Sequence, residues 1–123
     1  ALERLREAYP KARTHLSVNE KGRIVLIPVA DVLYLKAELK YVTIRTAERE
    51  FLIEESLTRL ESEFGETFQR IHRNCLVASA RIREIGKLPG EDDGHFLMLD
   101  GLDERLMVSR RQYSALRETL KSV

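Results

Sequence analysis

Two short segments carry the residues with the clearest capacity for chemistry. In the first, Phe68–Val77, apolar residues are interleaved with a basic and polar set: Arg70, His72, Arg73 and Asn74. In the second, Ser109–Gln112, two arginines stand between a serine and a glutamine. Guanidinium and amide groups hold phosphate oxygens, and they also pair with base edges in a DNA major groove. The two segments therefore predict two basic edges that bind a phosphate polymer.

Ser109–Gln112 has the pattern of a helix start. In a capping box, Ser109 accepts a hydrogen bond from the Gln112 amide while the Gln112 side chain reaches back. Arg110 and Arg111 would then lie in the first helical turn, where an uncompensated cation costs about 0.3–1 kcal/mol. Free amides, a hydroxyl and two guanidiniums together predict a phosphate site. The alternative is that both arginines pair with nearby carboxylates: Asp100, Asp103 or Glu104.

A turn at His72-Arg73-Asn74 would project three donors beyond a sheet. Arginine can pair with guanine there and asparagine with adenine, whereas the same groups on phosphates give affinity without sequence choice. For His72, a hydrogen bond to a neighbouring carbonyl is an equal alternative. Lys40-Tyr41 is a third basic turn, in which Tyr41 packs beside the DNA backbone and Lys40 neutralises it. A solvated lysine is the competing interpretation of that turn.

Catalysis and metal binding are not expected. The single cysteine, Cys75, and the three histidines lack the spacing of a zinc site. The six glycines are scattered singly and form no phosphate-binding loop. A nucleophile pair of Cys75 and His72 is disfavoured, because strand alternation would put the two side chains on opposite faces. The sequence therefore predicts neither an enzyme nor a bound cofactor.

Composition indicates one folded domain. The chain has 123 residues, of which 43 % are hydrophobic and 33 % charged, so a packed core under a charged surface is expected. No apolar run approaches the roughly 18 residues that suggest a membrane span. The charged segment Ala1–Arg13 does not resemble a signal peptide. One cysteine, predicted to be buried, fits a reducing compartment, so we expect a cytoplasmic protein.

Charge is segregated along the chain, although the formal net charge is only +1. Residues 48–66 contain seven acidic residues and two arginines, whereas residues 69–87 contain five basic residues and one glutamate. A further acidic stretch, Glu91–Asp93, precedes the basic C-terminal segment. This segregation suits a polyanion that one face attracts and another repels. An ordinary solvated surface is the alternative.

Short extended segments dominate the chain. The predicted strands are His15–Val18, Ile24–Pro28, Val32–Ala37, Tyr41–Thr46, Phe51–Ile53, Phe68–Ile71, Leu76–Ala78, Ile82–Leu88, Phe96–Leu99 and Leu106–Val108. Two helices are expected, one over Ser56–Phe64 that Gly65 ends, and one that begins at Ser109. Ala1–Thr14 is expected to be an interdomain linker, and residues 15–123 the folded domain.

Several of these segments together resemble the LytTR family of bacterial DNA-binding domains, in particular its alginate-regulator branch of response regulators. The segments that carry the resemblance are Asp31–Leu35, Lys40–Val42, Glu55–Leu57, Phe68–Val77, Ile82 and Val108–Arg111. The similarity extends from about His15 to Leu120. It implies an elongated, mostly β fold of small antiparallel sheets, with one short internal helix and a C-terminal helix.

The resemblance also implies how such a domain works. Loops enter successive major grooves of a bent duplex, usually at paired direct repeats in a promoter, where two copies of the protein can form a dimer. A receiver domain, phosphorylated on an aspartate, lies N-terminal to the domain in the intact protein. The residues that the resemblance brings to DNA are Lys40, Tyr41, His72, Arg73, Asn74, Ser109, Arg110, Arg111 and Gln112. Arg73 and Arg111 are expected to read bases.

Some positions depart from the family pattern. Asn74, Cys75 and Ala78 stand where members commonly carry serine, an aromatic residue and asparagine. Val42, at a position that some relatives use to contact a base, is expected to be buried, so the first loop would read little sequence.

The rival hypothesis is a protein-interaction module that docks an acidic partner through its basic edges.

Overall fold

The computed structural model describes residues 12–89 and 94–121. The strands in these ranges are β1 (His15–Glu20), β2 (Arg23–Pro28), β3 (Val32–Glu38), β4 (Tyr41–Thr46), β5 (Glu50–Ile53), β6 (Phe68–His72), β7 (Cys75–Ala78), β8 (Ile82–Lys87), β9 (His95–Leu99) and β10 (Leu106–Val108). The helices are α2 (Leu57–Glu63) and α3 (Arg110–Lys121), and short 3-10 turns cover Val29–Asp31 and Ser79–Arg81.

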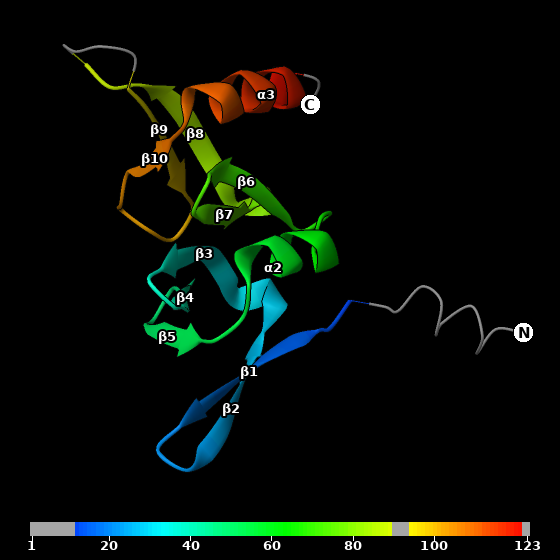
Figure 1. Ribbon diagram of the computed structural model, residues 1–123. Coiled ribbons are helices and arrows are strands. Elements are labelled where there is room, and N and C mark those ends of the chain that lie inside the picture. The colour runs from blue at the N-terminus through cyan, green and yellow to red at the C-terminus, as the bar shows by residue number, and fades with distance from the viewer. Residues whose placement is uncertain (1–11, 90–93, 122–123) are drawn as a thin grey trace, which may run out of the picture.

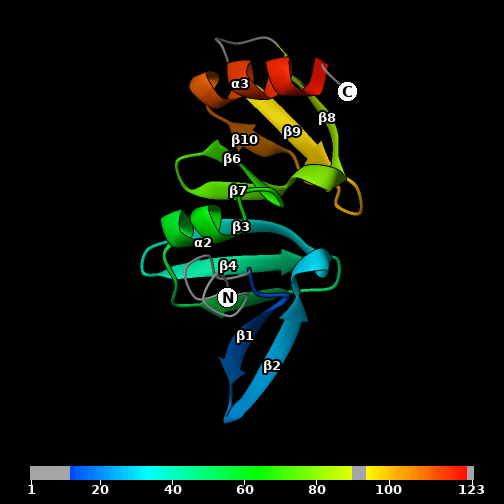
Figure 2. The same cartoon turned by 90° about the vertical axis from the view of Figure 1, so that its right-hand side faces the viewer.

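Three antiparallel sheets follow one another along the length of the molecule (Figure 1, Figure 2). The β1–β2 hairpin forms one end, the five-stranded sheet β5-β4-β3-β7-β6 forms the middle, and the three-stranded sheet β10-β9-β8 forms the other end beside α3. The predicted elongated, mostly β architecture with one internal and one terminal helix is confirmed.

Strands β3 and β7 of the middle sheet are buried on both faces, because a hydrophobic core lies on each side of them. Leu35 and Leu76 join the core shared with α2 and the hairpin. Leu33 and Val77, from the same two strands, join the core shared with the three-stranded sheet and α3. This is why β3 and β7 begin with continuous apolar runs, whereas half-buried strands alternate. The middle sheet thereby fixes the two ends of the domain relative to each other.

Two hairpins are tighter than the sequence indicated. β1 and β2 pair as far as Glu20 and Arg23, so only Lys21 and Gly22 form the turn, with φ values of 45° and 80°. Left-handed residues at both positions match the twist of the strands. β3 and β4 likewise pair as far as Glu38 and Tyr41, and this leaves a two-residue turn at Leu39 and Lys40.

The internal helix begins as predicted but ends differently. The Ser56 hydroxyl accepts a hydrogen bond from the Arg59 amide at 3.2 Å and caps α2. The last helical residue is Glu63, and Phe64 follows as the C-cap. Gly65 is not left-handed, so the prediction that it ends the helix through a glycine cap was wrong. Most of the predicted linker and the acidic stretch Glu91–Asp93 lie outside the described residues.

Candidate nucleic-acid interface

The turn between β6 and β7 contains only Arg73 and Asn74, because His72 still pairs with Cys75. Ile71 before the turn is fully buried, and it anchors the turn in the core. Arg73 is exposed, whereas His72 and Asn74 are half-buried. The backbone amide of Asn74 donates a hydrogen bond to Nδ1 of His72 at 3.4 Å. The partner of His72 is therefore a backbone N–H and not the carbonyl oxygen considered above. With Nδ1 as an acceptor, a neutral His72 carries its proton on Nε2 and can donate it outward.

The β3–β4 turn carries the second set of predicted residues. Lys40 is exposed, and its Nζ lies 5.2 Å from the centre of the Tyr41 ring. This is a cation–π distance, so Tyr41 orients the ammonium group near the tip of the turn. Val42 is 3 % exposed, as expected, and its side chain belongs to the core. Lys40 and Tyr41 are therefore presented by this turn, and Val42 is not.

The start of α3 carries the third set. The backbone amide of Gln112 donates a hydrogen bond to Oγ of Ser109 at 3.3 Å, and this forms the predicted N-terminal cap. The reciprocal half of the capping box is replaced, because the Ser109 amide donates to the carbonyl oxygen of Ile71 at 2.9 Å. Arg110 and Arg111 are exposed and Gln112 is half-buried. The first turn of the helix therefore presents its side chains around a serine cap.

Two main-chain hydrogen bonds join the three edges. The Ile71–Ser109 bond ties the β6–β7 hairpin to the start of α3, and the Ala37 amide donates to the carbonyl oxygen of Asn74 at 2.8 Å. The second bond ties the same hairpin to the end of β3, next to the β3–β4 turn. The β6–β7 turn is thus the central member of a preorganised surface, which loses little freedom when it binds.

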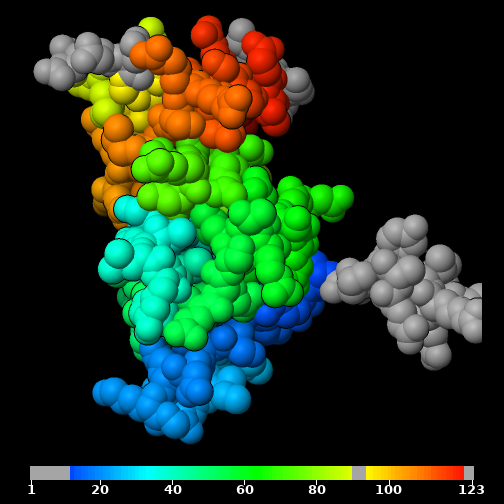
Figure 3. Space-filling model, viewed as in Figure 1, coloured from blue at the N-terminus to red at the C-terminus, as the bar shows by residue number. Residues whose placement is uncertain are grey.

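The three edges lie on one side of the molecule. In both Figure 1 and Figure 2 the β3–β4 turn, the β6–β7 turn and the start of α3 lie toward the left. Figure 3 shows the same segments as neighbouring areas of one surface, coloured cyan, green and orange. Within the part of the chain that the structure describes, the side chains of Arg73 and Arg111 form no ion pair. The pairing alternative is therefore not realised for Arg111.

Arg70 differs from the other donors because it points into the protein. Its side chain is 15 % exposed, and Nη2 lies 2.9 Å from Oε1 of Glu61 in α2. Its Nη1 donates to the carbonyl oxygen of Arg73. Arg70 therefore supports the turn that presents Arg73, a role that the sequence pattern did not indicate.

Arg13 is a second basic residue whose contacts were not predicted. Its amide and guanidinium both donate to Glu63 at 2.8–2.9 Å, and the guanidinium also donates to Glu55 at 2.8 Å. The two carboxylates raise the pKa of Arg13, and the Arg13 guanidinium lowers the pKa of Glu63. Because the partners are 42 and 50 residues away, no local signal in the sequence reveals them.

His72 and Cys75 do not lie on opposite faces, so the prediction from strand alternation was wrong. Cys75 and His72 are partners across the hairpin, and they line one pocket together with Lys36 and Arg105. The thiol is nevertheless 4 % exposed, and burial raises its pKa to about 12. At neutral pH the sulfur is a thiol and not the reactive thiolate.

The described ranges contain no cluster of three or more histidine, cysteine, aspartate or glutamate residues arranged to hold a metal ion. None of the helices in those ranges is both long and apolar enough to cross a membrane.

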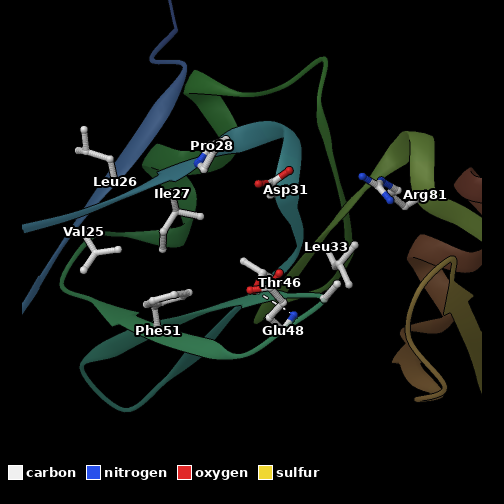
Figure 4. A pocket seen from close by; sticks show the side chains of 11 residues that line it. Val25, Leu26, Ile27, Pro28, Asp31, Leu33, Thr46, Glu48, Phe51 and Arg81 are labelled. Carbon is white, nitrogen blue, oxygen red and sulfur yellow. Dashed lines mark hydrogen bonds between the residues drawn. The ribbon is translucent and has the colours of Figure 1, made fainter.

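A different pocket, of about 300 Å³, lies away from the three edges (Figure 4). Leu26, Ile27 and Phe51 form its apolar lining, and Asp31 and Arg81 lie at the far end. The Val29–Asp31 turn beside it is to the right in Figure 2, opposite the three basic edges. The pocket and the basic surface are therefore separate features of the domain.

This combination of small stacked sheets and basic turns on one side defines a class of protein. Residues 22–121 match the family model of the LytTr DNA-binding domain, and the chain belongs to this family. It is therefore a DNA-binding domain of transcription regulators.

Individual relatives agree with this assignment. The chain is 46 % identical over 110 residues to the positive alginate biosynthesis regulatory protein of Pseudomonas aeruginosa, covering 88 % of this chain and 43 % of that protein. It is 32 % identical over 99 residues to an uncharacterized response regulatory protein of Vibrio cholerae, covering 80 % of this chain and 40 % of that protein. The chain thus spans less than half the length of each of these relatives.

A solved structure has the same fold. It is the LytTr DNA-binding domain of a putative methyl-accepting/DNA response regulator from Bacillus cereus. The TM-score is 0.74 at 25 % sequence identity, and the similarity covers 88 % of this chain and 97 % of the other.

Proposed function

We propose that this domain is the sequence-specific DNA-binding effector of a bacterial two-component transcription regulator, and that its three basic edges enter successive major grooves. The observation that carries the proposal is the fixed arrangement of the edges: main-chain hydrogen bonds from Ala37 to Asn74 and from Ser109 to Ile71 join them on one side. Shape, basic charge and preorganisation together suit a DNA duplex.

Each edge has a proposed role. Arg73 and Arg111 pair with base edges, since both side chains are exposed and neither has a carboxylate partner among the described residues. The remaining residues are proposed to position the domain on the DNA backbone, and Asn74, in the β6–β7 turn, is also a candidate for base contact. They are Lys40, Tyr41, His72, Asn74, Ser109, Arg110 and Gln112.

The partners follow from the same proposal. A receiver domain, phosphorylated on an aspartate, lies N-terminal to this domain in the intact protein, and Ala1–Thr14 serve as the linker between them. Two copies bind paired direct repeats of a promoter as a dimer. The protein works in the cytoplasm and has no catalytic activity of its own. The family membership and the response-regulator relatives support this context.

Titration of promoter and scrambled duplexes tests the proposal. The parent domain should prefer the promoter duplex, and log affinity should fall linearly with log salt concentration. Arg73→Ala and Arg111→Ala should each cost roughly 1–3 kcal/mol and relax the preference at one base position. Arg117→Ala, at the other end of α3, is the matched control and should bind as the parent does. Equal affinity of the parent for both duplexes would instead favour docking of an acidic protein partner.

A further inference from the structure

We infer that Leu39, at the tip of the β3–β4 turn, is a specificity-determining residue that contacts the methyl group of a thymine in the major groove. The inference rests on the proposed function, because it requires this turn to face DNA. It adds apolar recognition to an interface otherwise described by its charges and hydrogen bonds.

The first observation is exposure. Leu39 has a relative exposure of 107 %, whereas the other large exposed hydrophobic residues range from 54 % to 70 %. Those residues lie within strands: Ile24, Leu26, Leu52 and Met107. A leucine that is left in water at the end of a hairpin contributes no burial to the stability of the free domain. Its side chain is therefore available to a partner.

The second observation is the backbone of the same residue. Leu39 has a φ of 53°, in the left-handed region that a branched side chain disfavours and that glycine adopts freely. The pairing of Glu38 with Tyr41 holds both ends of the turn, and the hydrogen bond from Ala37 to Asn74 fixes its base. The two-residue turn requires a left-handed residue at this position, which glycine would supply without steric cost, so the turn geometry alone does not explain why a leucine stands here.

The third observation is the chemistry of the neighbourhood. Lys40 follows Leu39 and is held against Tyr41, and both are proposed to contact the DNA backbone. In the proposed complex, a leucine at the tip of this turn would enter the groove beside those backbone contacts, where the edges of base pairs are exposed. The C5 methyl group of thymine is the apolar group that a base pair presents in the major groove. A thymine methyl therefore fits Leu39 better than any phosphate or sugar does.

Replacement of thymine by uracil tests the contact, because uracil lacks this methyl group. Each thymine of the bound duplex is replaced in turn, and affinity is measured for the parent, Leu39→Ala and Leu26→Ala. Uracil at one position should weaken binding of the parent about fourfold, the value of one buried methyl group. Leu26→Ala, which removes an exposed leucine from β2, should show the same loss. Leu39→Ala should bind the thymine duplex about as weakly as the parent binds the uracil duplex. Replacing that thymine by uracil should then cause no further loss of affinity for Leu39→Ala.

Two results would overturn the inference. One is a uracil profile of Leu39→Ala that coincides with the profile of the parent. The other is a lower melting temperature for Leu39→Gly than for the parent, because that would make the leucine a structural residue. We expect Leu39→Gly to melt at the same temperature or higher. If the parent domain failed to distinguish promoter from scrambled duplex, the proposed function itself would be contradicted. This result differs from both results above, so failure of the proposed function can be told apart from failure of the Leu39 inference.

Discussion

Arg70 and Arg73 differ in role although they are three residues apart. Both were recognised in the sequence as donors next to apolar strands, but only Arg73 is exposed. Strand pairing shifts by one residue between Arg70 and His72, so simple alternation does not predict where each side chain points. The partner of Arg70 is Glu61, in a helix that precedes the strand. Residue types could therefore be predicted from the sequence, whereas their partners depended on tertiary structure.

Salt dependence should separate a supporting arginine from a phosphate contact. We expect Arg70→Met to weaken promoter binding, because Arg73 loses the donor on its carbonyl oxygen, but to leave the salt dependence unchanged. Lys40→Met should reduce the slope of log affinity against log salt by about 0.9. Fluorescence anisotropy at four or more salt concentrations measures both slopes. If Arg70→Met also reduced the slope of log affinity against log salt, Arg70 would contact a DNA phosphate and would not be a supporting residue.

The contact between Arg13 and Glu63 should make stability depend on pH. Because Arg13 lowers the pKa of Glu63 in the folded state, the contact stabilises the domain above the ordinary glutamate pKa of about 4.3. This contribution should disappear as the pH falls through the lowered value. Glu63→Gln should cost about 0.5–1 kcal/mol in free energy of unfolding at pH 7. The difference from the parent should shrink below about pH 4.

Urea denaturation of parent and variant at pH 7 and pH 3 measures this difference. Glu66→Gln removes a carboxylate that is exposed just beyond α2, and it should match the parent at both pH values. A cost of Glu63→Gln that stayed constant between the two pH values would contradict the assignment.

At the level of elements, the sequence predicted strands and helices well and turns less well. Periodicity and caps located each strand and α-helix of the described residues, because burial of one face sets the pattern, but they did not indicate the 3-10 turns at Val29–Asp31 and Ser79–Arg81. Turn lengths were overestimated at Lys21–Gly22 and at Arg73–Asn74, because cross-strand pairing continues to the last residue before each turn. The capping box was half correct, since the amide of Ser109 bonds to a residue 38 positions earlier.

Substitution of Ser109 should separate the stability of α3 from its contact with DNA. Ser109→Ala should destabilise the domain by about 0.5–2 kcal/mol, because Gln112 loses its cap. Ser109→Asp should retain the cap and hence the stability, while its negative charge repels phosphate. Thermal unfolding and DNA titration of the two variants measure the two effects. If Ser109→Asp and the parent bound the promoter with equal affinity, residue 109 would not lie next to the phosphate backbone of the DNA.

At the level of the whole molecule, the order of the sheets decides which edges meet. The sequence indicated separate basic segments but could not establish that they share a side, since this depends on a middle sheet whose strands β3 and β7 pack against a core on each face. The resemblance to a known family supplied this arrangement, and the three edges do lie together (Figure 1). Pairings such as β3 with β7 join residues about forty positions apart, beyond the range of local patterns.

The arrangement predicts a footprint on one face of the duplex. Loops in successive major grooves should protect the sugar backbone from hydroxyl radicals at intervals of about 10–10.5 base pairs. Protection should be weak between these intervals, since the three edges lie on one side of the domain. Continuous protection around the helix would contradict this mode of binding.

The bonds from Arg13 to both ends of the α2 region give any preceding segment a fixed point of departure. The chain enters β1 from the right in Figure 1, away from the three basic edges. If the proposed receiver domain is attached there, it would lie outside a duplex bound at the three basic edges, where it could contact a neighbouring copy without competing for DNA. Regulation would then change which molecules assemble along a promoter, while the affinity of each single domain for its DNA half-site would stay constant.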